Sequence, residues 1–495
     1  MKKIILILSL AILVLVIAGY LYWQIQRPII QGEWFQVDNI QKITRFQAKQ
    51  SEELEDNRIG IHAHCFWNPE GQGIFPNGVL DTSNILELGV KRARLGIKSL
   101  DAPDPGSLIA ADGDFEPELS IDPKHDEFIT NLADNGITIT YVLSFWDTEY
   151  VAQGGEVRYP RFKTEEEIQR YLDFVQFIVS HFKDRVQYFE IWNEPNAEDS
   201  IQGIEAKDYI NLVKRAVPVI REEYPEAKIV VGGTSYLIDS CTKEYLFNIL
   251  KSDIMPLVDV ISWHGMYGTS PEHKPVYSNE NAGYSYPNLD PLLIQETYYY
   301  GYPSIVQEIK DVASAHGFKG EYVGDELNWF TPDQAPPDAQ EMQPRQYAYS
   351  ETKCAKYYAR GIVMHLGIDL ATTAILQDKP LIFHSIQNLC TVTAGAKPID
   401  LPIEIQSEAT NMRSYGFSLS NGDKLIALWT DGVAVDDDPG INATLTIPNF
   451  SAQKVTGIDV LNGYQQSIIT SHENGNLVIQ NLIVRDYPLM LQINK

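Results

Sequence analysis

Short apolar runs alternate with longer amphipathic stretches over most of the chain. The apolar runs have the length of strands and lie at residues 59–64, 90–95, 137–145, 186–192, 228–232, 258–264, 321–325 and 369–376. Between them the sequence predicts helices over residues 82–88, 124–135, 165–183, 206–224, 243–250, 305–316 and 347–365. Strands that alternate with helices pair in parallel through right-handed crossovers, so the pattern predicts an α/β fold.

Eight such units favour a closed (β/α)8 TIM barrel over residues 58–410. A doubly wound open sheet is the alternative, but no GxGxxG motif follows the first strand and the count of eight favours closure. The connections after strands are long, at residues 65–80, 96–121, 146–163, 265–303 and 327–344, whereas those before strands are short. This asymmetry builds one loop-rich face, the C-terminal face on which active sites of this fold lie.

The pattern changes after residue 411, where short β-type runs follow one another without helices. These runs lie at residues 415–419, 425–429, 443–447, 453–459, 465–470, 477–480 and 489–493. Asn421-Gly422 and Asn462-Gly463 between them are hairpin signals. We therefore predict a C-terminal β-sandwich domain over residues 411–495. The acidic run 436–438 is either a calcium site or a solvated turn.

The N-terminal stretch predicts a membrane anchor. Residues 4–23 are almost entirely apolar, which is enough to cross a bilayer as a helix, and Lys2 and Lys3 precede them. That charge bias predicts a single anchor with the rest of the chain on the extracellular face. A cleaved signal peptide is the alternative, because Ala18-Gly19 offers small residues, and the protein would then be secreted. Residues 24–57 are polar and irregular, as expected of a linker.

Composition narrows the classes of partner. The 495 residues are 44% hydrophobic, which is ample for a large core, and the formal net charge of −27 disfavours binding to nucleic acid. The four cysteines are widely scattered, so one or two disulfides are possible but cannot be assigned. No CxxC motif occurs in the sequence, and we expect neither a metal site nor a cofactor.

Two carboxylates follow strands on opposite sides of the predicted barrel. Glu194 ends the fourth strand in Asn-Glu-Pro, where Pro195 turns the chain into a loop, and Glu326 ends the seventh strand. Two opposed carboxylates are what glycoside hydrolysis requires: one protonates the leaving oxygen, and the other attacks the anomeric carbon or activates water. Strand alternation predicts that Asp325 points away from Glu326, so that only one of the two reaches the cleft.

Aromatic residues gather at the same face. Five of the eight tryptophans end or follow strands there, and their rings are candidates for stacking on sugars: Trp67, Trp146, Trp192, Trp263 and Trp329. For any single tryptophan, packing in the core is the alternative. Histidines and an arginine also end strands at this face, at His62, His64, Arg94 and His264.

The stretch Tyr188–Asn196, with Phe-Glu-Ile-Trp-Asn-Glu-Pro-Asn, resembles the acid/base strand of clan A retaining glycoside hydrolases and is most similar to family 39. Glu326-Leu327-Asn328 resembles the surroundings of that family's nucleophile. The resemblance implies Glu194 as acid/base and Glu326 as nucleophile. The resemblance extends to His264, Tyr267 and Arg94. We expect these residues, together with Asn193, His64, Trp146 and Trp329, to bind the substrate. In many clan members the eighth strand ends in Trp, whereas this chain has Leu376-Gln377-Asp378.

The resemblance implies a retaining glycosidase that acts on a plant-type or microbial oligo- or polysaccharide, such as a β-xyloside. We expect the ionised nucleophile to raise the pKa of Glu194. A non-catalytic carbohydrate-binding protein on the same barrel is the alternative, but such a protein would usually lack one carboxylate. A phosphate-handling aldolase is a weaker alternative, since only Lys91 and Lys228 lie in strands, both near strand starts.

Overall fold

The computed structural model describes residues 35–36, 43–63, 81–96, 109–111, 118–121, 123–144, 160–197, 202–235, 237, 240–267, 271, 291–333 and 349–494. The predicted anchor at residues 4–23 lies outside these residues, as do His64, Trp67 and Trp146. Within the described ranges, no helix combines the length and the apolarity needed to cross a membrane.

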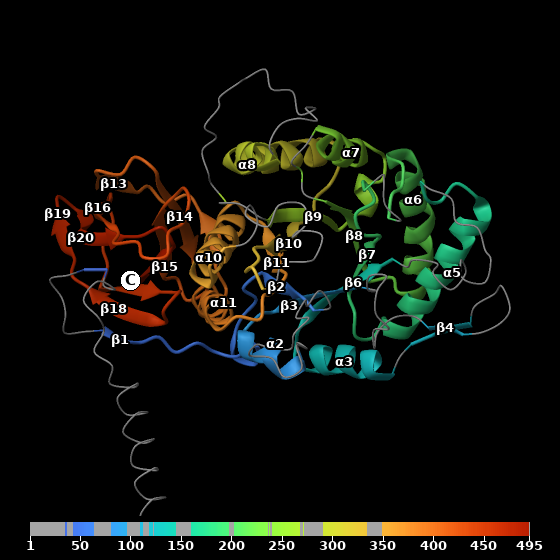
Figure 1. Ribbon diagram of the computed structural model, residues 1–495, viewed down its shortest axis with the longest axis horizontal. Coiled ribbons are helices and arrows are strands. Elements are labelled where there is room, and N and C mark those ends of the chain that lie inside the picture. Colours follow the sequence, from blue (N-terminus) through green and yellow to red (C-terminus); the bar gives the residue numbers. More distant parts are fainter. Residues whose placement is uncertain are drawn as a thin grey trace, which may run out of the picture.

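Eight parallel strands close into a barrel, which confirms the predicted fold (Figure 1). The strands are β2 (Ile59–His62), β3 (Arg92–Gly96), β6 (Thr138–Leu143), β7 (Tyr188–Ile191), β8 (Lys228–Thr234), β9 (Val260–Tyr267), β10 (Glu321–Asn328) and β11 (Ala371–Ala374). Each pairs in parallel with its neighbour in sequence, and β11 closes the ring on β2. The ends of these strands therefore meet at one mouth, where residues far apart in sequence become neighbours.

Helices surround the barrel. They are α2 (Thr82–Leu88), α3 (Pro123–Asp134), α5 (Glu165–Phe182), α6 (Ala206–Glu223), α7 (Ser240–Leu250), α8 (Pro291–Ala315), α10 (Glu351–Gly367) and α11 (Pro380–Val392). The last one was not predicted, and it completes the eighth unit. A hairpin of β4 (Ile109–Ala111) and β5 (Glu118–Ser120) also lies within the stretch predicted as a loop.

Local sequence explains where these helices begin and end. Asp81 accepts the backbone N–H of Asn84 at the start of α2, and Gly89 ends that helix in the left-handed region with φ 80°. Thr164 caps α5 in the same way. The buried side chains of α5 recur at helical spacing and face the barrel: Ile168, Tyr171, Leu172, Val175, Ile178, Val179 and Phe182.

Two antiparallel sheets follow the barrel. The seven-stranded sheet has the order β1-β18-β17-β21-β15-β14-β12, and the four-stranded sheet has the order β13-β16-β20-β19. The strands are β1 (Ile43–Arg45), β12 (Lys397–Ile399), β13 (Glu404–Ser407), β14 (Met412–Ser418), β15 (Lys424–Thr430), β16 (Ile441–Ile447), β17 (Lys454–Asp459), β18 (Tyr464–Ile468), β19 (Ser471–Glu473), β20 (Asn476–Val484) and β21 (Leu489–Asn494). Side chains from both sheets share one apolar core. We call this part the two-sheet domain.

The N-terminal stretch belongs to the two-sheet domain as well, although the sequence predicts a linker there. Strand β1 pairs antiparallel with β18, and Phe35 is buried in the core between the sheets. Gln36 donates to the carbonyl oxygens of Ile469 and Gln480 at 3.1 and 2.9 Å. The described chain therefore starts in the two-sheet domain, continues through the barrel, and ends in the two-sheet domain.

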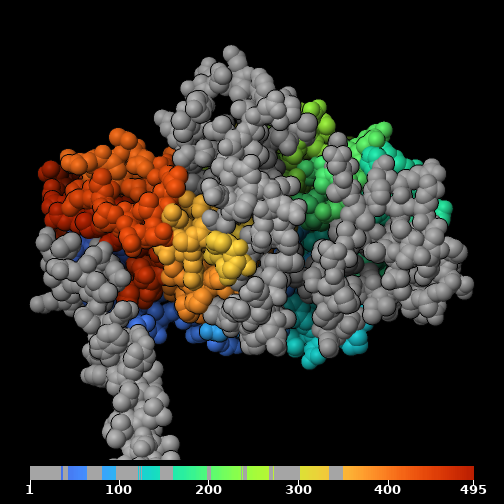
Figure 2. Space-filling view, viewed as in Figure 1, coloured from blue at the N-terminus to red at the C-terminus, as the bar shows by residue number. Residues whose placement is uncertain are grey.

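Helix α10 joins the barrel to the two-sheet domain. The buried Lys356 pairs with Asp486 at 2.6 Å, and Arg360 donates to the carbonyl oxygen of Gly432 at 2.7 Å. Asp438 accepts the backbone N–H of Asp486 at 2.6 Å. Asp438, one carboxylate of the acidic run 436–438, therefore helps to hold the loop that contains Asp486. Figure 2 shows that the surface of the two-sheet domain, orange to red, continues into that of residues 349–392.

Candidate active site

The turn after β7 presents Glu194 at the mouth of the barrel. The strand ends at Ile191, and both Trp192 and Glu194 then adopt left-handed backbone angles, with φ 68° and 45°. Such angles are costly for residues other than glycine and persist where the surroundings impose them. Here the backbone N–H of Glu194 donates to the carbonyl oxygen of Gly233 at 2.7 Å, which ties the turn to β8.

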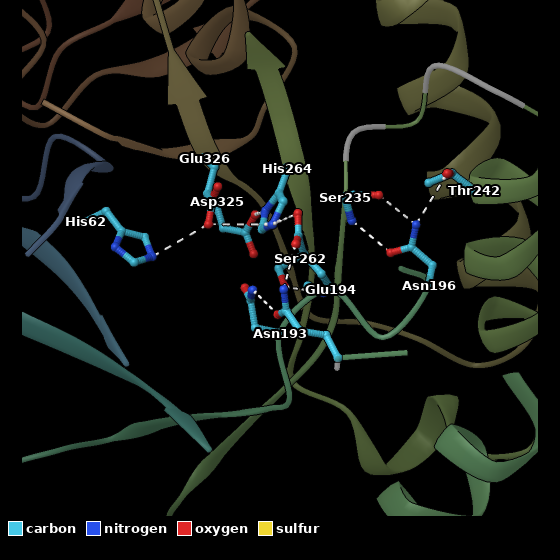
Figure 3. A network of polar contacts seen from close by, with 12 residues as sticks. His62, Asn193, Glu194, Asn196, Ser235, Thr242, Ser262, His264, Asp325 and Glu326 are labelled. Carbon is cyan, nitrogen blue, oxygen red and sulfur yellow. Dashed lines mark hydrogen bonds and ion pairs between the residues drawn. The ribbon is translucent and has the colours of Figure 1, made fainter. Parts of the chain in front are cut away.

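A bulge in β10 turns two successive carboxylates into the barrel. The pairing of β10 with β9 shifts register on both sides of Glu326. As a result, Asp325 and Glu326 both contact His264 on β9, at 2.9 and 3.5 Å (Figure 3). The prediction that strand alternation would point them apart is therefore wrong, because alternation fails where a strand gains an extra residue.

The guanidinium of Arg94, on β3, bonds to four side chains of the site. It donates to both oxygens of Glu190 at 2.7 and 2.8 Å, and it donates to Glu326 at 2.9 Å. A further bond of 2.7 Å reaches the Asn193 side-chain oxygen, and another of 2.7 Å reaches His62 Nε2. One rigid cation therefore fixes the position of Glu326, a catalytic candidate, and that of Asn193, the amide that precedes Glu194.

His264 lies between the carboxylates on the other side. Its Nδ1 faces Asp325 at 2.9 Å, while its Nε2 lies 3.3 Å from Glu194 and 3.5 Å from Glu326. The ring has no exposed surface. Burial alone would lower the pKa of His264, but the charges of Glu326 and Asp325 raise that pKa well above its ordinary value.

Gln202 adds a contact that the sequence does not reveal. Its side-chain nitrogen donates to Glu194 Oε2 at 3.0 Å, and its side-chain oxygen accepts from Asn193 at 2.8 Å. Asn193 and Glu194 are therefore linked to each other through one amide. Gln202 lies in a loop, where no strand pattern reports which way a side chain points.

Exposure separates the two catalytic candidates from the rest of the cluster. The side chains of Glu194 and Glu326 are 25% and 12% exposed, whereas those of Glu190 and Asp325 are 1% and 2% exposed. Only the first pair can meet a substrate at the mouth. Glu190 and Asp325 act on that pair through Arg94 and His264.

The pKa of Glu194 is shifted in the direction opposite to the expectation, and that of Glu326 is shifted the other way. Burial tends to raise the pKa of Glu194, but the hydrogen bond and charge of His264 outweigh it and the pKa is lowered. Burial raises the pKa of Glu326, and the charge of Glu194 adds to this effect. The expectation of a raised pKa for Glu194 in the free enzyme is therefore wrong, because His264 stabilises its carboxylate.

The aromatic prediction is also wrong for the tryptophans that the structure describes. Trp192, Trp263 and Trp329 have no exposed surface. Trp329 packs on Tyr357 and Tyr358 of α10, with ring centroids 6.1 and 5.2 Å apart. Its ring therefore stabilises the barrel wall and cannot stack on a sugar.

Three other residues that were predicted to bind substrate are described only in part or not at all. His64 and Trp146 lie outside the described residues. Tyr267 ends β9, where its backbone pairs with that of Asn328. Gln377 follows the eighth strand, β11, and donates to the Asn328 side-chain oxygen at 3.3 Å.

A family model agrees with this site. The model of glycosyl hydrolases family 39 matches residues 121–289, which include β6 to β9 and the turn that carries Glu194. Glu326 lies beyond the matched range, and its place rests on the geometry of β10.

Solved structures share the fold. A family 39 glycoside hydrolase from Bacteroides cellulosilyticus WH2 has a TM-score of 0.59 at 15% identity, over 91% of this chain and 83% of that one. The catalytic domain of a family 30 xylanase C from Talaromyces cellulolyticus has a TM-score of 0.53 at 10% identity, over 91% and 98%. A family 51 α-L-arabinofuranosidase from Bifidobacterium longum has a TM-score of 0.51 at 12% identity, over 91% and 98%.

Proposed function

We propose that the chain is a glycoside hydrolase that cleaves glycosidic bonds with retention of configuration. The match of residues 121–289 to the family 39 model supports this proposal. Glu326 is the nucleophile in this proposal and Glu194 the acid/base. The observation that carries it is that both carboxylates contact one nitrogen, His264 Nε2, at 3.3 and 3.5 Å. No other pair of partly exposed carboxylates among the described residues at this mouth shares such a contact.

The shared contact limits how far apart the carboxylates are. The separation of the two contacting oxygens cannot exceed the sum of their distances to His264 Nε2. Retaining enzymes hold their carboxyl groups about 5–5.5 Å apart, and inverting enzymes about 6.5–9.5 Å apart to admit a water. The sum lies below nearly all of the inverting range, which supports direct attack by Glu326.

The reaction then has two steps. Protonated Glu194 gives its proton to the leaving oxygen while Glu326 attacks the anomeric carbon and forms a glycosyl ester. Glu194, now ionised, takes a proton from water, and that water hydrolyses the ester. Asn193 is held by Arg94 and Gln202 and would bind the sugar 2-hydroxyl, where a hydrogen bond strengthens in the transition state.

The proposed substrate is a plant-type or microbial oligo- or polysaccharide, such as a β-xyloside. The resemblance of the Phe-Glu-Ile-Trp-Asn-Glu-Pro-Asn stretch to family 39, which includes β-xylosidases, supports this class. A panel of aryl glycosides and polysaccharides tests it, with aryl β-xyloside expected among the substrates. Turnover of other sugars with none of β-xyloside would overturn that assignment and leave the mechanism standing.

Product stereochemistry tests the mechanism. Proton NMR of early product from the unaltered enzyme should show the anomeric configuration of the substrate. A first product of opposite configuration would rule out double displacement.

Two substitutions test the roles. Glu326→Ala should lose turnover on every substrate, and small anions such as azide should restore part of it by attacking from the vacated side. Glu194→Ala should keep activity on substrates with good leaving groups, which need no proton in the first step, and should accumulate the glycosyl-enzyme. Near-normal rates of Glu326→Ala would refute the assignment.

We also propose that residues 4–23 anchor the protein, with the barrel outside the cell. Lys2, Lys3 and the apolar length support this topology. Because Phe35 is docked in the two-sheet domain, only residues 24–34 separate that domain from the anchor, a reach of at most about 40 Å. N-terminal sequencing of the native protein should find an intact start; a start near Gly19 would contradict the anchor.

A further inference from the structure

His264 is placed where a proton can be stored between the catalytic carboxylates. It lies on β9 with no exposed surface, and its two ring nitrogens face carboxylate oxygens in opposite directions (Figure 3). Nδ1 faces Asp325 at 2.9 Å, and Nε2 faces Glu194 and Glu326 at 3.3 and 3.5 Å. An ionised carboxylate only accepts hydrogen bonds, so this geometry suits a ring that carries a proton on each nitrogen.

The charges around the ring favour the same state. Four carboxylates gather here, and the other cation that faces them among the described residues is Arg94, which is already bonded to Glu190 and Glu326. Two cations against four carboxylates leave the cluster negative when His264 is charged, and more negative when it is neutral. The raised pKa of His264 agrees with this balance.

The first step of the proposed reaction needs a proton on Glu194, whose pKa in the resting site is lowered. We propose that Asp325 holds the catalytic proton on His264 in the resting enzyme, and that His264 passes this proton to Glu194 when substrate is bound. Asp325 is then a positioning residue that acts through His264. This inference rests on the proposed function and assigns the source of its first proton.

The transfer balances without another reactant. The Nε2–H bond of His264 breaks and an O–H bond of Glu194 forms, so the imidazolium becomes neutral and the carboxylate becomes a carboxylic acid. Nδ1 keeps its proton, which stays bonded to ionised Asp325. In the second step Glu194 takes a proton from water, and return of that proton to Nε2 restores the resting state.

Other titratable groups of the cluster are occupied differently. The titratable and charged groups of the cluster and its surroundings are His62 on β2, Arg94 on β3, Glu190 on β7, Glu194 in the turn after β7, Asp325 and Glu326 on β10, Tyr302 on α8 and His365 on α10. His62 Nε2 accepts from Arg94 at 2.7 Å, so that nitrogen carries no proton to give. Burial lowers the pKa of His365 to about 4, and its ring bonds to Gly361 and Tyr302.

The contact between Asp325 and His264 depends on the bulge in β10. A regular strand would have turned Asp325 out of the barrel when Glu326 faced in. The register shift at Glu326 brings both side chains to His264. The bulge therefore supplies the charge that stabilises the stored proton.

Asp325→Asn is the decisive variant, because the amide oxygen can still accept from Nδ1 while the charge is removed. Loss of a negative charge at this distance weakens proton binding by the His264–Glu194 pair, so the basic limb of kcat/KM should move down by about one pH unit or more. Turnover of substrates with poor leaving groups should fall roughly a hundredfold, and turnover of those with good leaving groups far less. Asp259→Asn, which removes a carboxylate at the opposite end of β9, is the matched control and should leave both readouts unchanged.

The outcomes separate this inference from the proposed function. Labelling of Glu326 by a 2-deoxy-2-fluoro glycoside, detected by mass spectrometry, reports double displacement in the unaltered enzyme and in both variants. Labelling with an unmoved or raised basic limb in Asp325→Asn would overturn the proton store alone, whereas an unlabelled wild-type enzyme would overturn the mechanism.

Nitrogen NMR of the unaltered enzyme decides the case if the variant fails to fold. Both ring nitrogens of His264 should be protonated near neutral pH in the free enzyme. A neutral ring there would refute the inference.

Discussion

The buried ion pair between Arg94 and Glu190 should be strongly coupled. Both side chains are almost fully enclosed, with 3% and 1% exposed, and two hydrogen bonds of 2.7 and 2.8 Å join them. Arg94→Met leaves the carboxylate of Glu190 buried without its partner, which should lower the free energy of unfolding by about 3–5 kcal/mol. Glu190→Gln keeps the bonds of Arg94 to Glu326 and Asn193, so its cost should be smaller, about 1–3 kcal/mol.

The double variant measures the coupling. With both charges gone, Glu190 is no longer left as a buried ion without its partner, so Arg94→Met combined with Glu190→Gln should cost about 2–3 kcal/mol less than the sum of the single changes. Equilibrium unfolding in urea, followed by tryptophan fluorescence, gives the four free energies that the cycle needs.

A matched pair serves as the control. Arg92 and Glu321 bond at 2.6 Å at the opposite end of the barrel, where they are 20% and 31% exposed. Their cycle should give a coupling of about 1 kcal/mol or less, since solvent screens the pair. Additive costs at Arg94 and Glu190, within about 0.5 kcal/mol, would refute the view that this pair anchors the site.

Three further changes test other contacts. Gln202→Leu removes a hydrogen bond to the acid/base carboxylate and should lower kcat about tenfold or more in initial-rate assays, with an unchanged unfolding midpoint. Lys356→Met leaves Asp486 buried without its cation and should lower the free energy of unfolding by about 3–5 kcal/mol in urea titrations. A chain that starts at residue 46 loses Phe35 and β1 and should be cleaved in the two-sheet domain by limited proteolysis, whereas a chain from residue 30 should resist.

The barrel could be predicted because its signals are local. Strands buried on both faces give apolar runs, and helix ends carry their own residues, such as Asp81 and Gly89 around α2. All eight strands therefore lie close to their predicted positions. Helix α11, which was not predicted, begins at Pro380, and Lys379 before it forms no side-chain cap that would mark a helix start.

Features that depend on distant contacts could not be predicted. Strand β1 is only three residues long, and it is defined by pairing with β18 at the other end of the chain. Tryptophans at strand ends look alike in sequence whether they face a cleft or α10, as Trp329 does. Glu190 did carry a signal, since a charged residue inside an apolar strand needs a partner such as Arg94.

The order of the catalytic pKa values is a property of the whole cluster, and substrate binding has to change it. In the resting site the pKa of Glu194 is lowered and that of Glu326 is raised. Each unit of difference corresponds to about 1.4 kcal/mol that binding must supply before the first step. Transfer of the proton from His264 to Glu194 ends the repulsion between Glu194 and ionised Glu326, but it also removes the positive charge of His264, which lowers the pKa of Glu326, so contacts with the substrate have to supply the difference. Arg94 still donates to Glu326 at 2.9 Å, so the nucleophile keeps its charge as water is excluded.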